Sequence, residues 1–288
     1  MKNYHALLQE VLDTGTRQSN RTGVDSISVP GAMLKFDLAY GFPAITTKKL
    51  AFKSMVAELI GFLRGYDNAA LFRDLGCAFW DQNANENAQW LANPNRRGGD
   101  DLGRVYGVQW RDWKRADGTS IDQVMTALRT IHERPTDRRI IISAWRPDEF
   151  DQMALPPCHV MYQFLVNVER RELNLCMYQR SADLFLGVPM NIASSALMLS
   201  LFAHITGYTP RHFTHFMADA HIYVNHVDQV REQLSREPFA APQLHIDERI
   251  PSYDGKNFAP ELINEIEPHH ITLLGYQHHP AIKAPMAV

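Results

Sequence analysis

Strand-like segments in this chain gather in its middle and do not alternate regularly with helices. Residues 139–145, 159–168 and 172–179 are rich in β-branched and aromatic side chains, which favour strands. A further strand is predicted at residues 212–219, and a polar turn at residues 20–23 precedes a predicted hairpin at 26–36. Because no linker or repeat divides these elements, the pattern predicts one α+β domain over residues 1–288.

Helical segments flank these strands. Apolar side chains recur on one face of four amphipathic helices, predicted at residues 2–13, 50–64, 121–132 and 224–234. Residues 190–206 are apolar almost all round, which predicts a mostly buried helix. The segment near residues 84–100 is rich in Asn, Gly, Pro and Arg, and this composition predicts a long exposed loop.

Composition narrows the class of protein. The chain has 288 residues, 45% of them hydrophobic, and a formal net charge of −3, so it can build a core and carries no excess charge for nucleic acid. Its three cysteines are odd in number and lack metal-type spacing, which favours a reduced, cytoplasmic setting. We find no apolar run approaching the roughly 20 residues that span a bilayer, and expect no membrane or DNA partner.

One cysteine follows two prolines and precedes a histidine, in Leu-Pro-Pro-Cys-His at residues 155–159. Pro156 and Pro157 fix φ and stiffen their segment, so Cys158 would lie on a rigid corner that leads into a predicted strand. Such a corner is a good place to aim a nucleophile. A free cysteine is also often a small buried apolar residue, and this fragment alone leaves both interpretations open.

An isolated carboxyl lies in the second predicted helix. Glu58 has almost no polar neighbours in sequence, so desolvation would raise its pKa and suit it to proton transfer near neutral pH. Alternatively, Glu58 faces water through a gap in the apolar face. The sequence alone does not decide between these positions.

Four arginines suit a phosphate group. Arg21 lies on a predicted turn, Arg138 and Arg139 precede a strand, and Arg180 is followed by Ser181. Arginine forks match phosphate oxygens in a bidentate manner, and a serine hydroxyl adds a donor. Each arginine by itself is more readily explained as a surface charge.

Amide and sugar-directed groups occur further along the chain. Asn191 starts an apolar run and suits either an N-cap or the hydrogen-bonding edge of a pyrimidine. His221 and Tyr223 fall on the same side of an extended segment. They could bond a sugar hydroxyl or be ordinary half-buried polar residues.

Together these segments resemble the folate-dependent thymidylate synthase family, in the family's order, from Tyr4 to the last residue. The resemblance rests on Leu-Pro-Pro-Cys-His at 155–159, Tyr-Gln-Arg-Ser-Ala-Asp-Leu-Phe-Leu-Gly-Val-Pro at 178–189, Asn-Ile-Ala-Ser at 191–194, Asp-Ala-His-Ile-Tyr at 219–223, Leu-Ser-Arg-Glu-Pro at 234–238 and the C-terminal residues 282–288. One such segment could arise by chance, but this series in order favours Cys158 as a nucleophile.

The resemblance implies a mixed sheet wrapped by helices, and a homodimer in which the sheets pack back to back. It implies reductive methylation of dUMP to dTMP, with 5,10-methylenetetrahydrofolate as one-carbon and hydride donor and a covalent Cys158–C6 adduct. dUMP and folate are the expected ligands, and no metal is expected. Arg138 and Arg139 would reach the site across the dimer interface.

The resemblance also implies roles for particular residues. The catalytic set would be Cys158, Glu58, Tyr106, His159 and Asn191. The dUMP site would comprise Arg21, Arg138, Arg139, Arg180, Ser181, Asp183, Asn191, His221 and Tyr223. The folate side would comprise Trp80, Asp183, Leu155, Gly187 and Ala287. The chemistry agrees, because thiolate addition at C6 of uracil turns the poorly nucleophilic C5 into an enolate.

Several positions depart from the commonest family pattern. Gly61 and Asn83 stand where compact members usually have tryptophan, Ser195 and Met190 replace aromatic residues beside Asn191, and Gln-His replaces Asp-Pro at 277–278. These departures keep open a 5-hydroxymethylase on the same scaffold, in which water replaces the hydride. A catalytically silent nucleotide- or RNA-binding homologue is a more remote alternative.

Overall fold

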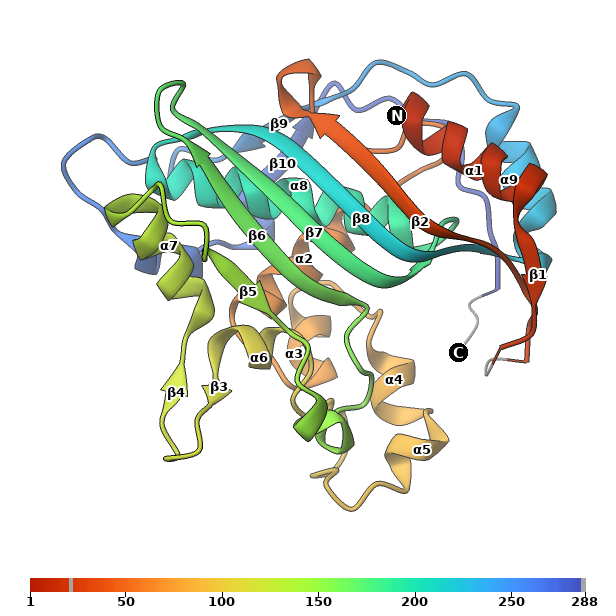
Figure 1. Ribbon diagram of the computed structural model, residues 1–288, viewed down its shortest axis with the longest axis horizontal. Coiled ribbons are helices and arrows are strands. Elements are labelled where there is room, and N and C mark those ends of the chain that lie inside the picture. Colours follow the sequence, from red (N-terminus) through yellow and green to blue (C-terminus); the bar gives the residue numbers. More distant parts are fainter. Residues whose placement is uncertain (21–22, 286–288) are drawn as a thin grey trace.

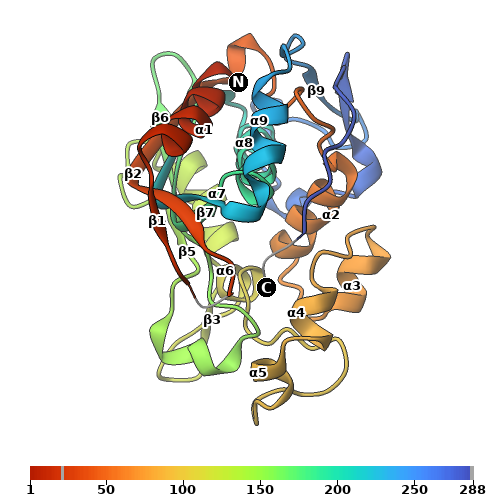
Figure 2. The same cartoon turned by 90° about the vertical axis from the view of Figure 1, so that its right-hand side faces the viewer.

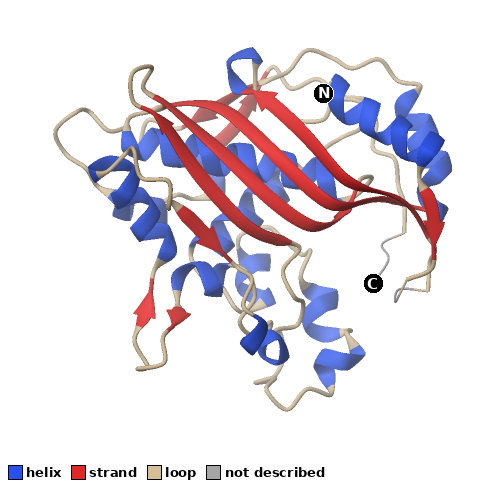
Figure 3. Cartoon of the chain, viewed as in Figure 1, coloured by secondary structure: helices blue, strands red, loops and turns tan. Residues whose placement is uncertain are grey.

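The computed structural model describes residues 1–20 and 23–285, and its central feature is a six-stranded sheet (Figures 1 and 3). The helices are α1 Lys2–Thr14, α2 Phe52–Leu63, α3 Ala69–Asp74, α4 Asp81–Asn85, α5 Ala88–Leu91, α6 Gly107–Arg111, α7 Gln123–Glu133, α8 Gly187–Thr206 and α9 Val227–Leu234. The strands are β1 Thr16–Gln18, β2 Ser26–Asp37, β3 Trp113–Lys114, β4 Ser120–Ile121, β5 Ile141–Ser143, β6 His159–Asn167, β7 Glu172–Asp183, β8 Thr209–Tyr223, β9 Gln243–Ile246 and β10 Ile271–Leu274.

The sheet is mixed. Its strand order is β1-β2-β8-β7-β6-β5, in which β7 and β8 run parallel and the other neighbours are antiparallel. A parallel pair needs a crossover connection, and α8 supplies it. The predicted α+β class and mixed sheet are therefore confirmed.

Helix α8 is the centre of the core. It packs against β7, β8 and α2, and nearly all of its side chains are buried. Among the described residues it is the one helix long and apolar enough to cross a membrane, but 83% of its apolar window is buried inside the molecule. The expectation that no such run exists was wrong, and burial on all sides explains why this one is so apolar.

The predicted hairpin at residues 26–36 is wrong, because β2 is one continuous strand. It pairs with β8 along its length from Ser26 to Asp37, and with β1 only at its first residues. Gly31, at φ +72°, absorbs the Pro-Gly turn signal without ending the strand. Beyond β1 the strand lies at the sheet edge, where proline is tolerated.

The segment near residues 84–100 is not a plain loop. It contains the end of α4 and all of α5, and the buried indole of Trp90 donates to the Asp101 carbonyl at 2.6 Å. Asn87 caps α5 by accepting from two backbone N–H groups. The asparagines that suggested a loop instead cap a short helix, which is a role for which asparagine is favoured.

One face of the sheet carries no helix. In Figure 2 the sheet is seen nearly edge-on, with α2 and α8 on one side of it. On the open face lie large apolar side chains that are 37–53% exposed, and we call this set the sheet-face patch: Met33, Ile141, Leu165, Tyr178 and Phe216. Such a concentration of exposed apolar surface marks an interaction site.

Candidate active site

Cys158 lies on a corner that backbone hydrogen bonds hold in place. Arg180 donates from its guanidinium to the carbonyls of Pro157 (2.8 Å) and Pro156 (2.9 Å), and from its backbone N–H to the Cys158 carbonyl (3.0 Å). The Cys158 N–H donates to the Tyr106 hydroxyl at 2.8 Å. The thiol itself is free and only partly buried, so the buried-cysteine interpretation does not hold.

Glu58 and Trp80 form the next part of the site. The indole N–H of Trp80 donates to Glu58 Oε1 at 3.0 Å, and the Trp80 ring lies 5.6 Å from that of Tyr106. Burial against the apolar α2 environment raises the pKa of Glu58 to about 7, although the bond from Trp80 opposes this effect. Glu58 is partly buried, and its raised pKa is consistent with the desolvated carboxyl expected from the sequence.

Tyr106 connects this carboxyl to the cysteine corner. Its ring stacks on Phe62 and meets His159 edge-on, with ring centroids 5.0 and 5.5 Å away. Burial, followed by the proximity of Cys158, raises the pKa of the Tyr106 hydroxyl well above its ordinary value. The hydroxyl therefore stays neutral, and can accept a proton only while it passes its own onward.

Asn191 and His159 meet at the start of α8. Asn191 is the fifth residue of α8, which begins at Gly187, so the N-cap interpretation is wrong. Its Oδ1 accepts from Gln179 Nε2 at 3.1 Å, and it also hydrogen-bonds His159. Burial lowers the pKa of His159 to about 4, so its imidazole is neutral at physiological pH.

Asp183 and His221 face each other at the ends of β7 and β8, where they are paired in register. Asp183 Oδ1 accepts from the backbone N–H groups of Phe185 and Leu186, at 3.0 and 3.3 Å. Burial lowers the pKa of His221, but Asp219 at 3.3 Å outweighs this and leaves that pKa raised. The His221 ring meets the Tyr223 ring edge-on at 5.1 Å.

Gly187 lies beside this group. A Cβ placed on it would meet Asn191 and Asp183 only at ordinary van der Waals distances. Ser181, on β7, and Leu155, just before the Cys158 corner, are half-buried. The structure thus joins most of the predicted site residues in one continuous set that runs from α2 through the Cys158 corner to the end of β8.

Two predicted arginines lie apart from this set. Arg138 and Arg139 are exposed just before β5, and Arg139 pairs with Asp137 at 2.9 Å. Arg21 and Ala287 lie outside the described residues.

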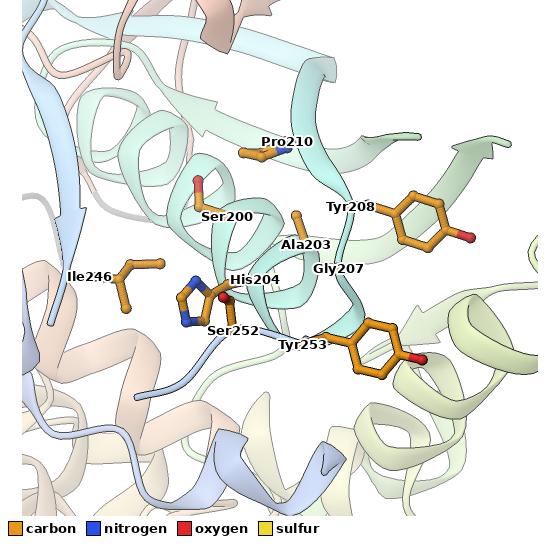
Figure 4. A pocket seen from close by; sticks show the side chains of 9 residues that line it. All are labelled: Ser200, Ala203, His204, Gly207, Tyr208, Pro210, Ile246, Ser252 and Tyr253. Atoms are coloured by element: carbon orange, nitrogen blue, oxygen red, sulfur yellow. The ribbon is translucent and has the colours of Figure 1, made fainter. Parts of the chain in front are cut away.

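A separate cavity opens at the far end of α8. It measures about 370 Å³ and is lined by nine residues that include His204, Tyr208 and Tyr253 (Figure 4). His204 lies 13 residues beyond Asn191, which places it about 20 Å further along the helix. None of the predicted site residues lines this cavity.

Sequence reasoning missed Gln179 and His215. His215 Nε2 bonds Gln179 Oε1 at 2.8 Å, and both side chains are buried. A usable signal was present, because each residue falls where period-2 alternation predicts an inward apolar side chain: Leu173, Leu175, Met177, Gln179 on β7 and Phe213, His215, Met217 on β8. A polar residue at such a position should be hydrogen-bonded.

The departure at Gly61 has a structural explanation. A Cβ on Gly61 would lie 2.4 Å from the ring of Phe72, which is fully buried and packs edge-on against Phe62. The Phe72 ring therefore occupies the space that a larger side chain at residue 61 would need. An aromatic ring therefore still lies beside Trp80, but Phe72 supplies it and not residue 61.

A partly exposed thiol on a fixed corner, linked through Tyr106 and Trp80 to a carboxyl of raised pKa, is an arrangement typical of enzymes that use nucleophilic catalysis. Comparison with known proteins agrees. A family model described as thymidylate synthase matches residues 2–288. A thymidylate synthase of Pseudomonas putida is 52% identical over 323 aligned positions, and those of Bordetella parapertussis and Pseudomonas syringae pv. tomato are each 49% identical, with 100% of both chains covered. The chain belongs to the thymidylate synthase family.

Glu58 should make stability depend on pH. Its pKa is about 7 in the folded protein against an ordinary value of 4.5, so the folded state disfavours its ionisation. Stability contributed by the protonated form is complete below pH 4.5 and is lost as pH rises to 7. Glu58→Gln stays neutral and can still accept from Trp80. Its free energy of unfolding relative to the parent should therefore rise between pH 5 and pH 8, by about 1–3 kcal/mol after allowance for partial exposure.

Urea unfolding of both proteins at the two pH values, at one protein concentration, measures this difference. An equal difference at pH 5 and pH 8 would show that Glu58 titrates normally. Activity serves as a separate readout, since Glu58→Gln should also lose turnover.

Proposed function

We propose that Cys158 is the nucleophile in the reductive methylation of dUMP to dTMP. Conversion of dUMP with 5,10-methylenetetrahydrofolate is the activity of the family to which this enzyme belongs. The observation that carries the residue assignment is the Cys158 corner, where a free, partly exposed thiol is held by bonds from Arg180 and to Tyr106. A fixed nucleophile gains rate because its orientation is settled before substrate binds.

Addition of the Cys158 thiolate at C6 forms the S–C6 bond and shifts the C5–C6 electron pair toward C5 and O4. Asn191, with neutral His159 beside it, would donate to O4 and stabilise the charge there. The folate supplies the one-carbon unit and the hydride. Tyr106 would relay the proton that leaves C5, and Glu58 would exchange protons through ordered water. Departure of the thiolate from C6 restores the enzyme.

The dUMP phosphate would be bound by Arg21, Arg180 and Ser181, together with Arg138 and Arg139 from the partner subunit. Two observations support a shared site. The sheet-face patch offers an apolar surface for a second copy, and the two exposed arginines beside it make no hydrogen bond to a site residue among the described parts of their own chain. His221 and Tyr223 would take the deoxyribose hydroxyl.

On the folate side, the fixed Asp183 carboxylate fits an acceptor for a pterin amino group. Its Oδ1 is held by two backbone N–H groups, which leaves the second oxygen to accept from a ligand. Trp80 and Leu155 would line the ring, and Gly187 leaves space beside Asp183. Ala287, near the C-terminus, is also proposed to belong to the folate side. The proposed reaction requires no metal.

The reduced state of the cysteines favours a cytoplasmic location. All three are free, and two of them are partly exposed.

Product analysis tests the reaction itself. The enzyme is incubated with dUMP and 5,10-methylenetetrahydrofolate, and the nucleotide product is identified by mass spectrometry. We expect the 5-methyl product together with oxidised dihydrofolate. A 5-hydroxymethyl product would show that water, and not hydride, meets the exocyclic methylene. No product would favour a silent binding homologue.

Base choice should depend on Asn191. Its amide can donate to O4 of uracil and accept from N3–H, whereas cytosine presents the opposite pattern. Asn191→Asp keeps the size but becomes acceptor-only when ionised, so it would repel O4 and could accept from the cytosine amino group. At about 1–3 kcal/mol for each unpaired buried group, the variant should lose activity on dUMP and gain relative preference for dCMP. kcat/KM for both nucleotides in both proteins measures this, and an unchanged ratio would place base reading elsewhere.

A further inference from the structure

A row of buried polar side chains runs from β8 to α8 behind the site. His215 on β8 bonds Gln179 on β7, and Gln179 bonds Asn191 on α8. His215 is fully buried and Gln179 nearly so. Burying such polar groups costs free energy unless each is hydrogen-bonded. The orientation of each side chain in the row therefore limits the orientation of the next.

The orientation of this row follows from one fixed acceptor. Gln179 Nε2 lies 2.8 Å from the Ser181 backbone carbonyl, which can only accept. The Gln179 atom at that position is therefore its nitrogen, and the other end is oxygen. The same nitrogen lies 3.1 Å from Asn191, which must turn its own oxygen toward it. Gln179 therefore contacts the Asn191 oxygen, and the Asn191 nitrogen is the group that we assign to O4 of uracil.

His215 holds the opposite end of the Gln179 amide. Because Gln179 Oε1 accepts, His215 Nε2 must carry the hydrogen. Burial lowers the pKa of His215 to about 3, so the ring is neutral and has this one N–H. Its Nδ1 has no partner among the described residues, so the bond to Gln179 is the one hydrogen bond that the ring makes to them.

We propose that His215 is a positioning residue for base selection, which acts through Gln179 to keep the Asn191 amide in the uracil-reading orientation. This inference rests on the proposed role of Asn191. For cytosine, Asn191 would have to turn its nitrogen toward Gln179, so that two N–H groups would face each other. The Ser181 carbonyl, which can only accept, opposes a turn of Gln179 that would relieve this clash, and the Nε2–H of His215 opposes it as well in the present tautomer.

The alternative is a purely structural role, in which His215 only fills space between β7 and β8. Loss of its side chain would then lower stability without altering which base is bound. The ratio of two nucleotide affinities separates these possibilities, because a general loss of stability does not favour one base over the other.

The experiment compares KM for dUMP with the inhibition constant of dCMP in three variants. His215→Leu removes the donor, and leaves the buried Gln179 oxygen unpaired. His215→Gln places an amide N–H near the position of Nε2. His204→Leu is the matched control. It removes a different histidine, which lies on α8 beside the remote cavity and donates to the Ile250 carbonyl at 2.7 Å.

We expect discrimination against dCMP to fall by about tenfold in His215→Leu and to change by less than about threefold in His215→Gln and His204→Leu. If His215→Leu does not fold, His215→Asn replaces it, since its shorter amide cannot reach Gln179 and should also lose discrimination. Unchanged discrimination in these variants, while Asn191→Asp alters it, would overturn the role of His215 alone. If Asn191→Asp also changes nothing, the proposed role of Asn191 fails as well.

Discussion

Cys158→Ser is expected to abolish turnover, by on the order of a thousandfold or more, while dUMP still binds. A serine hydroxyl has no comparable anionic population at neutral pH, so it cannot add to C6 at a useful rate. Binding should survive because the bonds that hold the corner, from Arg180 and to Tyr106, involve the backbone and not the thiol. Steady-state kcat and a dUMP dissociation constant measure the two effects.

Cys176→Ser is the matched control. Cys176 lies on β7 at the open sheet face, and burial raises the pKa of its thiol although a hydrogen bond with Thr214 opposes this effect. Its replacement should leave turnover within a few-fold of the parent. Near-normal turnover in Cys158→Ser would remove the nucleophile assignment, whatever Cys176→Ser does.

Mixed dimers should recover activity from two inactive subunits. If Arg138 acts across the interface, Arg138→Ala supplies an intact Cys158 and a Cys158→Ser subunit supplies an intact Arg138. Each heterodimer then has one complete site, and random mixing makes about half of the dimers heterodimers, so activity should return to about a quarter of the parent value. Activity after refolding the mixed subunits together measures this.

Separate tags on the two subunits show whether heterodimers form. No recovery in purified heterodimers would place Arg138 outside the site of its partner. An additional charge in the sheet-face patch, such as Leu165→Lys, provides an independent check. It should weaken dimers and, if sites are shared, lower activity at low protein concentration.

Elements with strong periodicity were predictable from the sequence. Helices α1, α2, α7 and α9 lie within a few residues of the expected ranges, because their apolar stripes face the core. The sequence did not predict β2 or the segment near residues 84–100 correctly. Turn and cap residues indicate only the conformation of their immediate neighbours, and not how a segment pairs or packs. Pro30-Gly31 can end a strand or lie within an edge strand, and only the pairing with β8 decides.

The site was predictable only in part. Glu58, Trp80 and Cys158 are far apart in sequence, and the resemblance brought them together before the structure did. The hydrogen-bond partners of the Asn191 amide could not be predicted, because the bond from Gln179 to Asn191 depends on how β7 packs against α8. That packing also shows that Asn191 lies inside its helix, which local sequence did not reveal.

Trapping with 5-fluoro-dUMP and 5,10-methylenetetrahydrofolate tests the central claim most directly. Fluorine at C5 cannot leave as a cation, so the reaction should stop after the S–C6 and C5–methylene bonds have formed. Proteolysis and mass spectrometry then locate the adduct. We predict that the nucleotide and the folate are found together on the peptide that contains Cys158. Absence of a covalent adduct, or an adduct on Cys77 or Cys176, would contradict the account.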